Sequence, residues 1–76
     1  MLDAVTVGRV IQCCREERRK SQELVSGFAG IGRTHLSAIE RGERRPTLET
    51  FWKISEALGM KPSQLMAEIE KELGKG

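Results

Sequence analysis

Hydrophobic residues recur along the chain at intervals of three and four, the spacing that places them on one face of a helix. No segment alternates strictly between apolar and polar residues, so no strand is predicted. The pattern indicates an all-α fold with five helices, at about residues 4–19, 22–29, 33–41, 48–58 and 62–73.

Residues that begin or end helices stand at the boundaries of these segments. Side chains able to cap a helix start precede the first, second and fourth segments: Asp3 or Thr6, Ser21 and Thr47. Glycines able to end a helix follow the second, third and fourth segments: Gly30, Gly42 and Gly59. Pro62 suits the first turn of the fifth helix, because that position needs no backbone N–H.

Each predicted helix has an apolar stripe that we expect to face a common core. The stripes comprise Val7, Val10, Ile11 and Cys14; Leu24, Val25 and Phe28; Leu36 and Ile39; Leu48, Phe51, Ile54 and Leu58; and Leu65, Met66, Ile69 and Leu73. A chain of 76 residues has room for a single domain, residues 1–76. A core of this size is marginal, so association with a second copy would add stability.

Composition narrows the class of protein. Hydrophobic residues make up 38% of the chain and charged residues 32%, which fits a soluble globular domain. No apolar run approaches the ~20 residues of a membrane span, and the N-terminus lacks the pattern of a signal peptide. We therefore expect a cytoplasmic protein with no membrane partner.

The two cysteines, Cys13 and Cys14, are adjacent and cannot form an ordinary disulfide with each other. They lack the spacing of a metal site, and the only histidine, His35, lies in another predicted helix. We expect Cys14 in the core and Cys13 partly exposed, with a redox sensor as the alternative. No metal, cofactor or small-molecule ligand is expected.

The net charge of +2 is unevenly distributed. The residues before Leu48 include nine cations and six acids, for a net charge of +3, whereas the remainder has four lysines and five glutamates, for −1. All the arginines lie in the first part. Because arginine pairs well with phosphates and with guanine edges, the asymmetry favours an anionic partner.

The segment from Ser21 to Gly42 contains the most informative motif. It predicts two short helices joined by a turn at residues 30–32, and the second helix is amphipathic. With Ile39-Glu40-Arg41-Gly42 and Pro46-Thr47-Leu48-Glu49-Thr50, it resembles the helix-turn-helix of lambda repressor and Cro-like proteins, the Xre family, over about residues 7–66. The resemblance implies a five-helix lambda-repressor-like domain whose recognition helix, residues 33–41, enters the major groove of double-stranded DNA.

The resemblance also implies roles for individual residues. Base contacts are expected from Arg33, Thr34, Ser37 and Ala38, and Arg33 suits guanine best because it can bind O6 and N7 together. Phosphate contacts are expected from Gln22, His35, Arg41, Arg44 and Arg45, with a solvated basic surface as the alternative. Family members usually have serine or threonine before the recognition helix, whereas this chain has Gly32, so one side-chain cap and one phosphate contact are missing.

Two further features follow from the same resemblance. Glu40 is expected to form a structural ion pair with Arg15 rather than to act in catalysis. Family members often dimerise through their C-terminal helices, and the residues expected at such an interface are Trp52, Met66, Ile69 and Leu73. The alternative is that these apolar residues only close the core of the monomer.

The function expected is that of a sequence-specific transcriptional regulator that binds a palindromic operator as a homodimer. The chain is also similar to the small controller proteins of restriction–modification systems, although a phage-type repressor or an antitoxin has much the same pattern. The alternative from another class is a protein-interaction module that kept the fold without specific DNA binding. No enzyme is expected, because no nucleophile has a matched base and no glycine-rich phosphate loop follows a strand.

Overall fold

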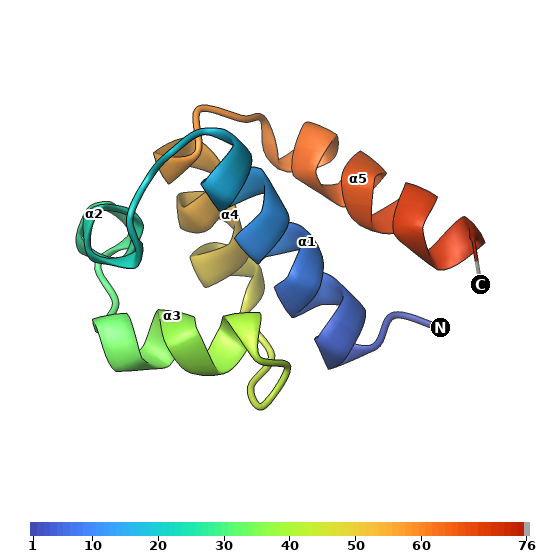
Figure 1. Ribbon diagram of the computed structural model, residues 1–76, viewed down its shortest axis with the longest axis horizontal. Coiled ribbons are helices and arrows are strands. Elements are labelled where there is room, and N and C mark those ends of the chain that lie inside the picture. Colours follow the sequence, from blue (N-terminus) through green and yellow to red (C-terminus); the bar gives the residue numbers. More distant parts are fainter. Residues whose placement is uncertain (76) are drawn as a thin grey trace.

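The computed structural model describes residues 1–75 and, within them, contains five helices and no strand. The helices are α1 (Ala4–Glu17), α2 (Gln22–Ala29), α3 (Arg33–Glu40), α4 (Leu48–Ala57) and α5 (Pro62–Gly74). α1 packs against α3 and α5, and α4 packs against α2 and α5 (Figure 1). The predicted all-α architecture is confirmed, and each helix begins at or next to the residue expected.

The helix boundaries follow from local hydrogen bonds. Side chains of Asp3, Ser21 and Thr47 accept backbone N–H bonds at the starts of α1, α2 and α4, at 2.7, 3.0 and 3.0 Å. These contacts satisfy N–H groups that have no partner inside the helix. α1 ends at Glu17 rather than at Arg19, because Arg19 adopts a left-handed backbone with φ of 55°.

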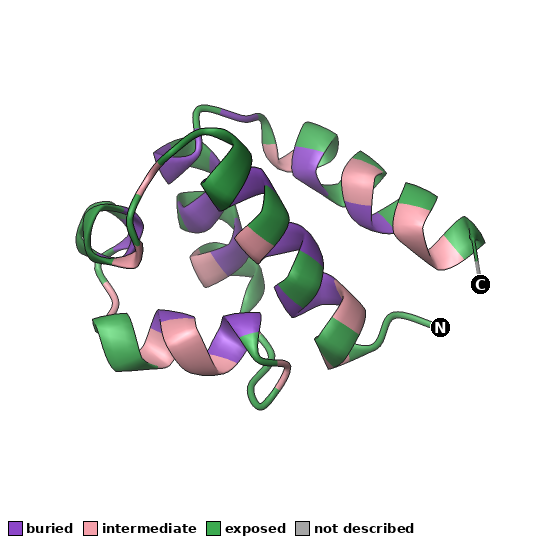
Figure 2. Cartoon of the chain, in the orientation of Figure 1, coloured by how far each residue is buried: buried purple, intermediate pink, exposed green. Residues whose placement is uncertain are grey.

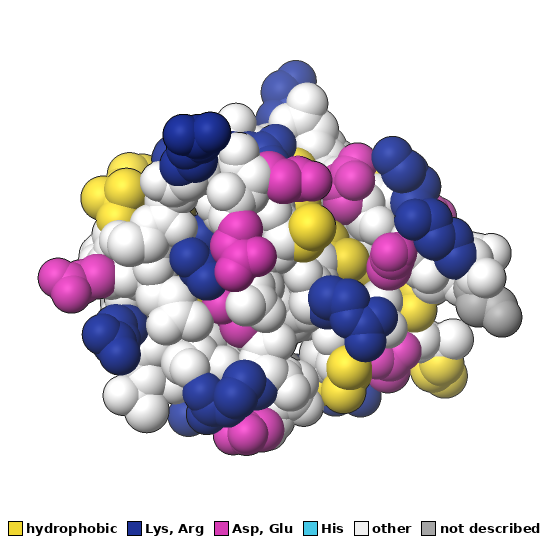
Figure 3. Space-filling model, viewed as in Figure 1, with side chains coloured by type: hydrophobic (Ala, Val, Ile, Leu, Met, Phe, Trp, Pro, Cys, Tyr) yellow, Lys and Arg dark blue, Asp and Glu magenta, His cyan; other side chains and the backbone are white. Residues whose placement is uncertain are grey.

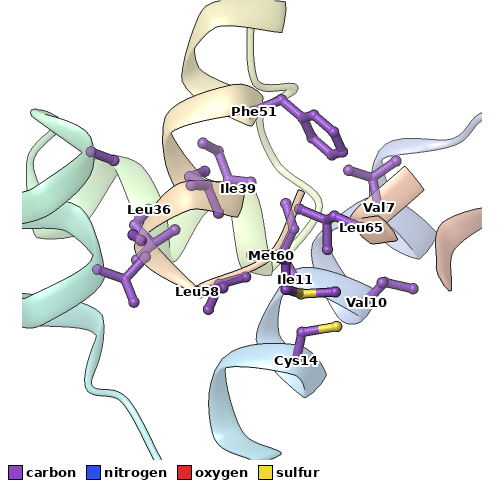
Figure 4. Close-up of a cluster of buried hydrophobic side chains, with 14 of the residues drawn as sticks. Val7, Val10, Ile11, Cys14, Leu36, Ile39, Phe51, Leu58, Met60 and Leu65 are labelled. Carbon is purple, nitrogen blue, oxygen red and sulfur yellow. The ribbon is translucent and has the colours of Figure 1, made fainter. Parts of the chain in front are cut away.

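All five helices contribute to one hydrophobic core (Figure 4). Ile11, Leu36, Ile39, Leu65 and Ile69 are completely buried. The buried positions form continuous stripes on the inner faces of the helices, whereas the outer faces are exposed (Figure 2). Among residues 1–75, no helix combines the length and the apolar character that crossing a membrane requires.

Four residues of the predicted apolar stripes are exposed instead. Leu24 and Phe28 of α2 are 57% and 65% exposed, Leu48 of α4 is 84% exposed and Met66 of α5 is 37% exposed. In α2 the buried face is that of Val25 and Ala29, and positions one residue earlier fall on the neighbouring face. Leu48 is the first residue of α4, where the helix has just left the exposed loop.

α1 and α3 approach closely at Gly8. A Cβ atom at this position would lie 2.1 Å from the carbonyl oxygen of Ile39 and 2.7 Å from that of Glu40. No side chain fits in that space, so only glycine lets the backbone of α1 rest directly on the end of α3. This contact allows the close approach of α1 and α3.

Candidate nucleic-acid interface

α2 and α3 form a helix-turn-helix. Gly30 adopts φ of 72°, a left-handed conformation that costs glycine little. The N–H of Ile31 donates to the carbonyl of Ser26 at 3.0 Å, which closes the end of α2. The Ile31 side chain packs against the core, so the turn is anchored to the molecule. The motif expected from the sequence is therefore present with its two helices held at a fixed angle.

α3 presents its N-terminal half to solvent. Of the residues expected to contact bases, Arg33 and Thr34 are exposed, and Ser37 and Ala38 are half-buried one turn later. Leu36 on the opposite face is completely buried and anchors the helix. Because the N-cap is a glycine, the structure shows no side-chain hydrogen bond at the helix start. The N–H groups there remain available to an acceptor such as a phosphate oxygen.

The residues expected to contact phosphates lie around this helix. His35 and Gln22 are half-buried, whereas Arg41, Arg44 and Arg45 are exposed. Basic side chains are visible over α3 and the loop after it, and an acidic group adjoins them at the loop (Figure 3). The surface around α3 is therefore basic without being uniformly so.

Two of the three loop arginines bind groups of the protein itself. Arg41 donates from Nε and Nη2 to the carboxylate of Glu43, at 2.9 and 3.1 Å. This pairing raises the pKa of Arg41 and lowers the pKa of Glu43 below its usual value of 4.5. Arg45 donates to the carbonyl oxygen of Leu2 at 2.8 Å. Neither contact could be predicted from the pattern of residues in the sequence.

A buried polar network links α1 to both helices of the helix-turn-helix. Arg15 of α1 donates to both carboxylate oxygens of Glu40, at 2.7 and 3.0 Å, as the expected ion pair requires. Gln22 donates from Nε2 to the same carboxylate at 2.9 Å, and Arg15 also donates to the carbonyl of Lys20 at 2.8 Å. The network joins α1, the start of α2 and the end of α3. One N–H of the Gln22 amide is left for another acceptor.

The residues expected at a dimer interface do not all reach the surface. Ile69 is completely buried, so its assignment to an exposed interface is wrong; its side chain is needed in the core. Leu73 is partly buried and packs against the core. Trp52 and Met66 are 57% and 37% exposed, as an interface requires.

Leu48 is the most exposed of the apolar residues that were expected in the core. It lines one cleft with Phe51, Met66 and Ile69, and a second, shallower one with Trp52. The sequence does contain a signal that Leu48 is exposed. It directly follows the Thr47 cap and stands four residues before Trp52, so the two side chains share one face of α4. Leu48 therefore connects the apolar surface of α4 to that of α5.

The cysteines show no reactive environment. Cys14 is buried and Cys13 is exposed, as expected. Burial is the main cause that raises the pKa of both thiols, and neighbouring carboxylates, Glu17 among them, raise it further. The thiolate form is therefore disfavoured. No cluster of three or more potential metal ligands occurs in the part of the chain that the structure describes.

Comparison with known proteins places this geometry in a family. A family model described as "Helix-turn-helix" matches residues 13–65. Control protein C.MunI of Mycoplasma sp. is 36% identical over 69 residues, which cover 90% of this chain and 93% of that protein. Control protein C.BamHI of Bacillus amyloliquefaciens is 38% identical over 58 residues, which cover 76% of this chain and 72% of that protein.

Solved structures agree with the sequence comparison. The wild-type restriction–modification controller protein C.Esp1396I superposes with a TM-score of 0.88 and 27% identity, over 96% of this chain and 95% of that one. These matches span the helix-turn-helix together with the flanking helices. The chain therefore belongs to the helix-turn-helix family of DNA-binding transcriptional regulators, which are not enzymes.

Proposed function

We propose that this protein binds a palindromic operator as a homodimer and regulates transcription by occupying it. The observation that carries the proposal is the exposed N-terminal half of α3, where Arg33 and Thr34 project from a helix whose other face is buried. A helix in this position enters the major groove with its first residues against the bases. Arg33 would bind O6 and N7 of a guanine, and Thr34 would contact a neighbouring base.

Phosphate contacts would orient α3 in the groove. Gln22 stands at the start of α2 with its amide held by Glu40 and one N–H free for a phosphate oxygen. His35, Arg41, Arg44 and Arg45 would reach the backbone around α3. These contacts carry little sequence information, but they determine the register on which the base contacts depend.

The homodimer would form through the exposed apolar side chains of Leu48, Trp52 and Met66. These residues belong to α4 and α5, and a cleft beside Leu48 and Met66 offers a site for an apolar side chain of the second copy. A surface of this kind on a small protein favours association. Two-fold symmetry would place the recognition helices about 34 Å apart, one helical turn of DNA.

The regulated system is inferred from the relatives. Several similar proteins bear the names of controller proteins of restriction–modification systems, and their length matches that of this chain. We infer that this protein controls the expression of such a system in the cytoplasm. Regulation would depend on protein concentration and operator occupancy.

Selection from random duplex DNA at two salt concentrations, followed by sequencing, tests the proposal. Recovery of a palindrome supports sequence-specific dimeric binding. Binding that is lost with salt and enriches no motif would show phosphate attachment only, which contradicts an operator. Absence of binding at low salt would favour a protein-interaction module, for which the exposed Leu24 and Phe28 on α2 provide a second apolar surface.

A further inference from the structure

Arg41 and Glu43 form a two-bond ion pair at the end of α3. Nε and Nη2 of Arg41 donate to the two carboxylate oxygens at 2.9 and 3.1 Å. Nη1 donates to the hydroxyl of Ser37, one turn back along the helix. The guanidinium is therefore held against α3 by three contacts, although both charged side chains are more than half exposed.

The backbone holds Glu43 in position for this pairing. Gly42 adopts φ of 78°, its N–H donates to the carbonyl of Ile39 at 3.0 Å, and the N–H of Glu43 donates to that of Ala38 at 2.9 Å. These two bonds form a Schellman motif, a common and well-ordered end of a helix. The backbone at Glu43 is therefore ordered, which keeps its carboxylate within reach of Arg41.

The other arginines near α3 differ in this respect. Among residues 1–75, the side chains of Arg33 and Arg44 take part in no ion pair, and Arg45 binds a backbone carbonyl rather than a carboxylate. Glu43 directly precedes Arg44 in sequence, yet its carboxylate bonds to Arg41. The carboxylate therefore acts on Arg41 selectively.

We propose that Glu43 competes with DNA phosphate for Arg41 and thereby weakens the attachment of the protein to DNA. The inference rests on the proposed function. Carboxylate and phosphate both match the fork of donors on a guanidinium, so a phosphate can bind Arg41 fully only after Glu43 is displaced. Because the ion pair belongs to the free protein, the cost of displacing Glu43 is the same on the operator and on any other duplex where a phosphate binds Arg41. In a complex that keeps the ion pair, that cost is absent and the phosphate contact is lost.

The competition is modest in size and depends on salt. An exposed ion pair alters an equilibrium by a small factor, about two- to five-fold. That factor applies to every duplex whose phosphate binds Arg41, the operator included. Both the pair and the phosphate contact are screened by salt, so the effect is largest at low ionic strength.

The experiment measures binding to a scrambled duplex and to the selected operator by fluorescence anisotropy at low salt. Glu43→Gln should tighten operator binding about two- to five-fold and tighten binding to the scrambled duplex by no more than that. Glu70→Gln makes the same change of charge at an exposed position on α5 and serves as the control. In an Arg41→Gln background, Glu43→Gln should have no further effect beyond that of the control.

Two results overturn the inference. If Glu43→Gln tightens operator binding no more than Glu70→Gln does, Glu43 does not compete for Arg41. If its full effect persists in the Arg41→Gln background, Glu43 acts by repelling the DNA directly. Both results leave operator binding by the wild-type protein intact. They are therefore distinct from failure of the proposed function, in which the wild type binds neither duplex or binds both equally.

Discussion

Arg15 of α1 and Glu40 of α3 form a buried ion pair with two hydrogen bonds, and they are 25 residues apart in sequence. The side chain of Glu40 is only 2% exposed and that of Arg15 only 11%. Hydrogen bonding to Glu40 is the main cause that raises the pKa of Arg15, against the opposing effect of burial. The pair joins the first helix to the last turn of the recognition helix, so it supports the geometry on which DNA binding depends.

Removing one charge from this pair should be costly. Glu40→Gln leaves the buried Arg15 guanidinium with only the exposed carboxylate of Glu16, at 4.0 Å, as a counter-ion. We expect a loss of about 3–5 kcal/mol in the free energy of unfolding. Urea denaturation of the wild type and the variant measures the difference. The double variant Arg15→Met/Glu40→Leu should lose less than Glu40→Gln, because it leaves no buried charge. A cost of Glu40→Gln similar to that of an exposed acid would contradict this account.

Two glycines provide a matched pair of packing predictions. Gly8→Ala places a methyl group against the carbonyl oxygens of Ile39 and Glu40, so it should destabilise the fold by about 1–3 kcal/mol or more. Gly27→Ala meets no atom within 4 Å in an exposed helical position. It should stabilise the fold by about 0.5–1 kcal/mol, since alanine is the better helix former. Thermal unfolding measures the stability of both variants. If the two substitutions changed stability equally, the backbone of α1 would have moved to make room for the methyl group at position 8.

Arg33→Ala tests the role of the recognition helix. Loss of a guanine contact should weaken operator binding by about 1–3 kcal/mol and relax specificity at one base position. Unfolding should be unchanged, because Arg33 is exposed. Arg9→Ala removes the same charge from α1, beside α5, and is the control. If the two variants bind the operator equally well, Arg33 does not read a base.

Leu48→Ser should weaken the dimer without unfolding the monomer. The side chain is 84% exposed in the monomer, so its removal costs little within one copy but deletes apolar area between two copies. Sedimentation velocity over a range of concentrations measures the monomer–dimer equilibrium. Phe28→Ser, on the exposed face of α2, is the matched control. Dissociation by Phe28→Ser but not by Leu48→Ser would place the interface on α2 instead.

Asp3 should make stability depend on pH at the acid end. A hydrogen bond from the Thr6 backbone amide, with a second from its hydroxyl, holds the pKa of Asp3 below its usual value of 3.8. A lowered pKa means that ionised Asp3 stabilises the fold, fully above that usual value and progressively less as the pH falls through the folded-state pKa. Asp3→Asn keeps a cap without the charge.

The measurement is thermal unfolding of the wild type and Asp3→Asn from neutral to acid pH. Other carboxylates titrate in both proteins, so the difference between the two melting temperatures isolates Asp3. We expect any advantage of the wild type to shrink as the pH falls below the usual aspartate pKa. A difference that is constant with pH would mean that the charge of Asp3 contributes nothing to stability.

Features that depend on neighbours in sequence could be predicted from the sequence alone. Capping by Ser21 and Thr47 requires only residues three positions away, and a left-handed Gly30 is a local preference. Helical spacing likewise identified Ile11 and Cys14 as core residues. The Arg15–Glu40 pair could be predicted only through resemblance to a family, because no local pattern connects residues 25 positions apart.

Only the tertiary structure decided which of several local possibilities is realised. The sequence determined that α2 is amphipathic, but the packing of α2 against α3 and α4 decided that Val25 is buried and Phe28 exposed. The packing of α4 and α5 likewise buried Ile69 in the core and left Leu48 exposed. The physical reason is that burial depends on where neighbouring helices lie, whereas caps and turns depend on the chain within a few residues.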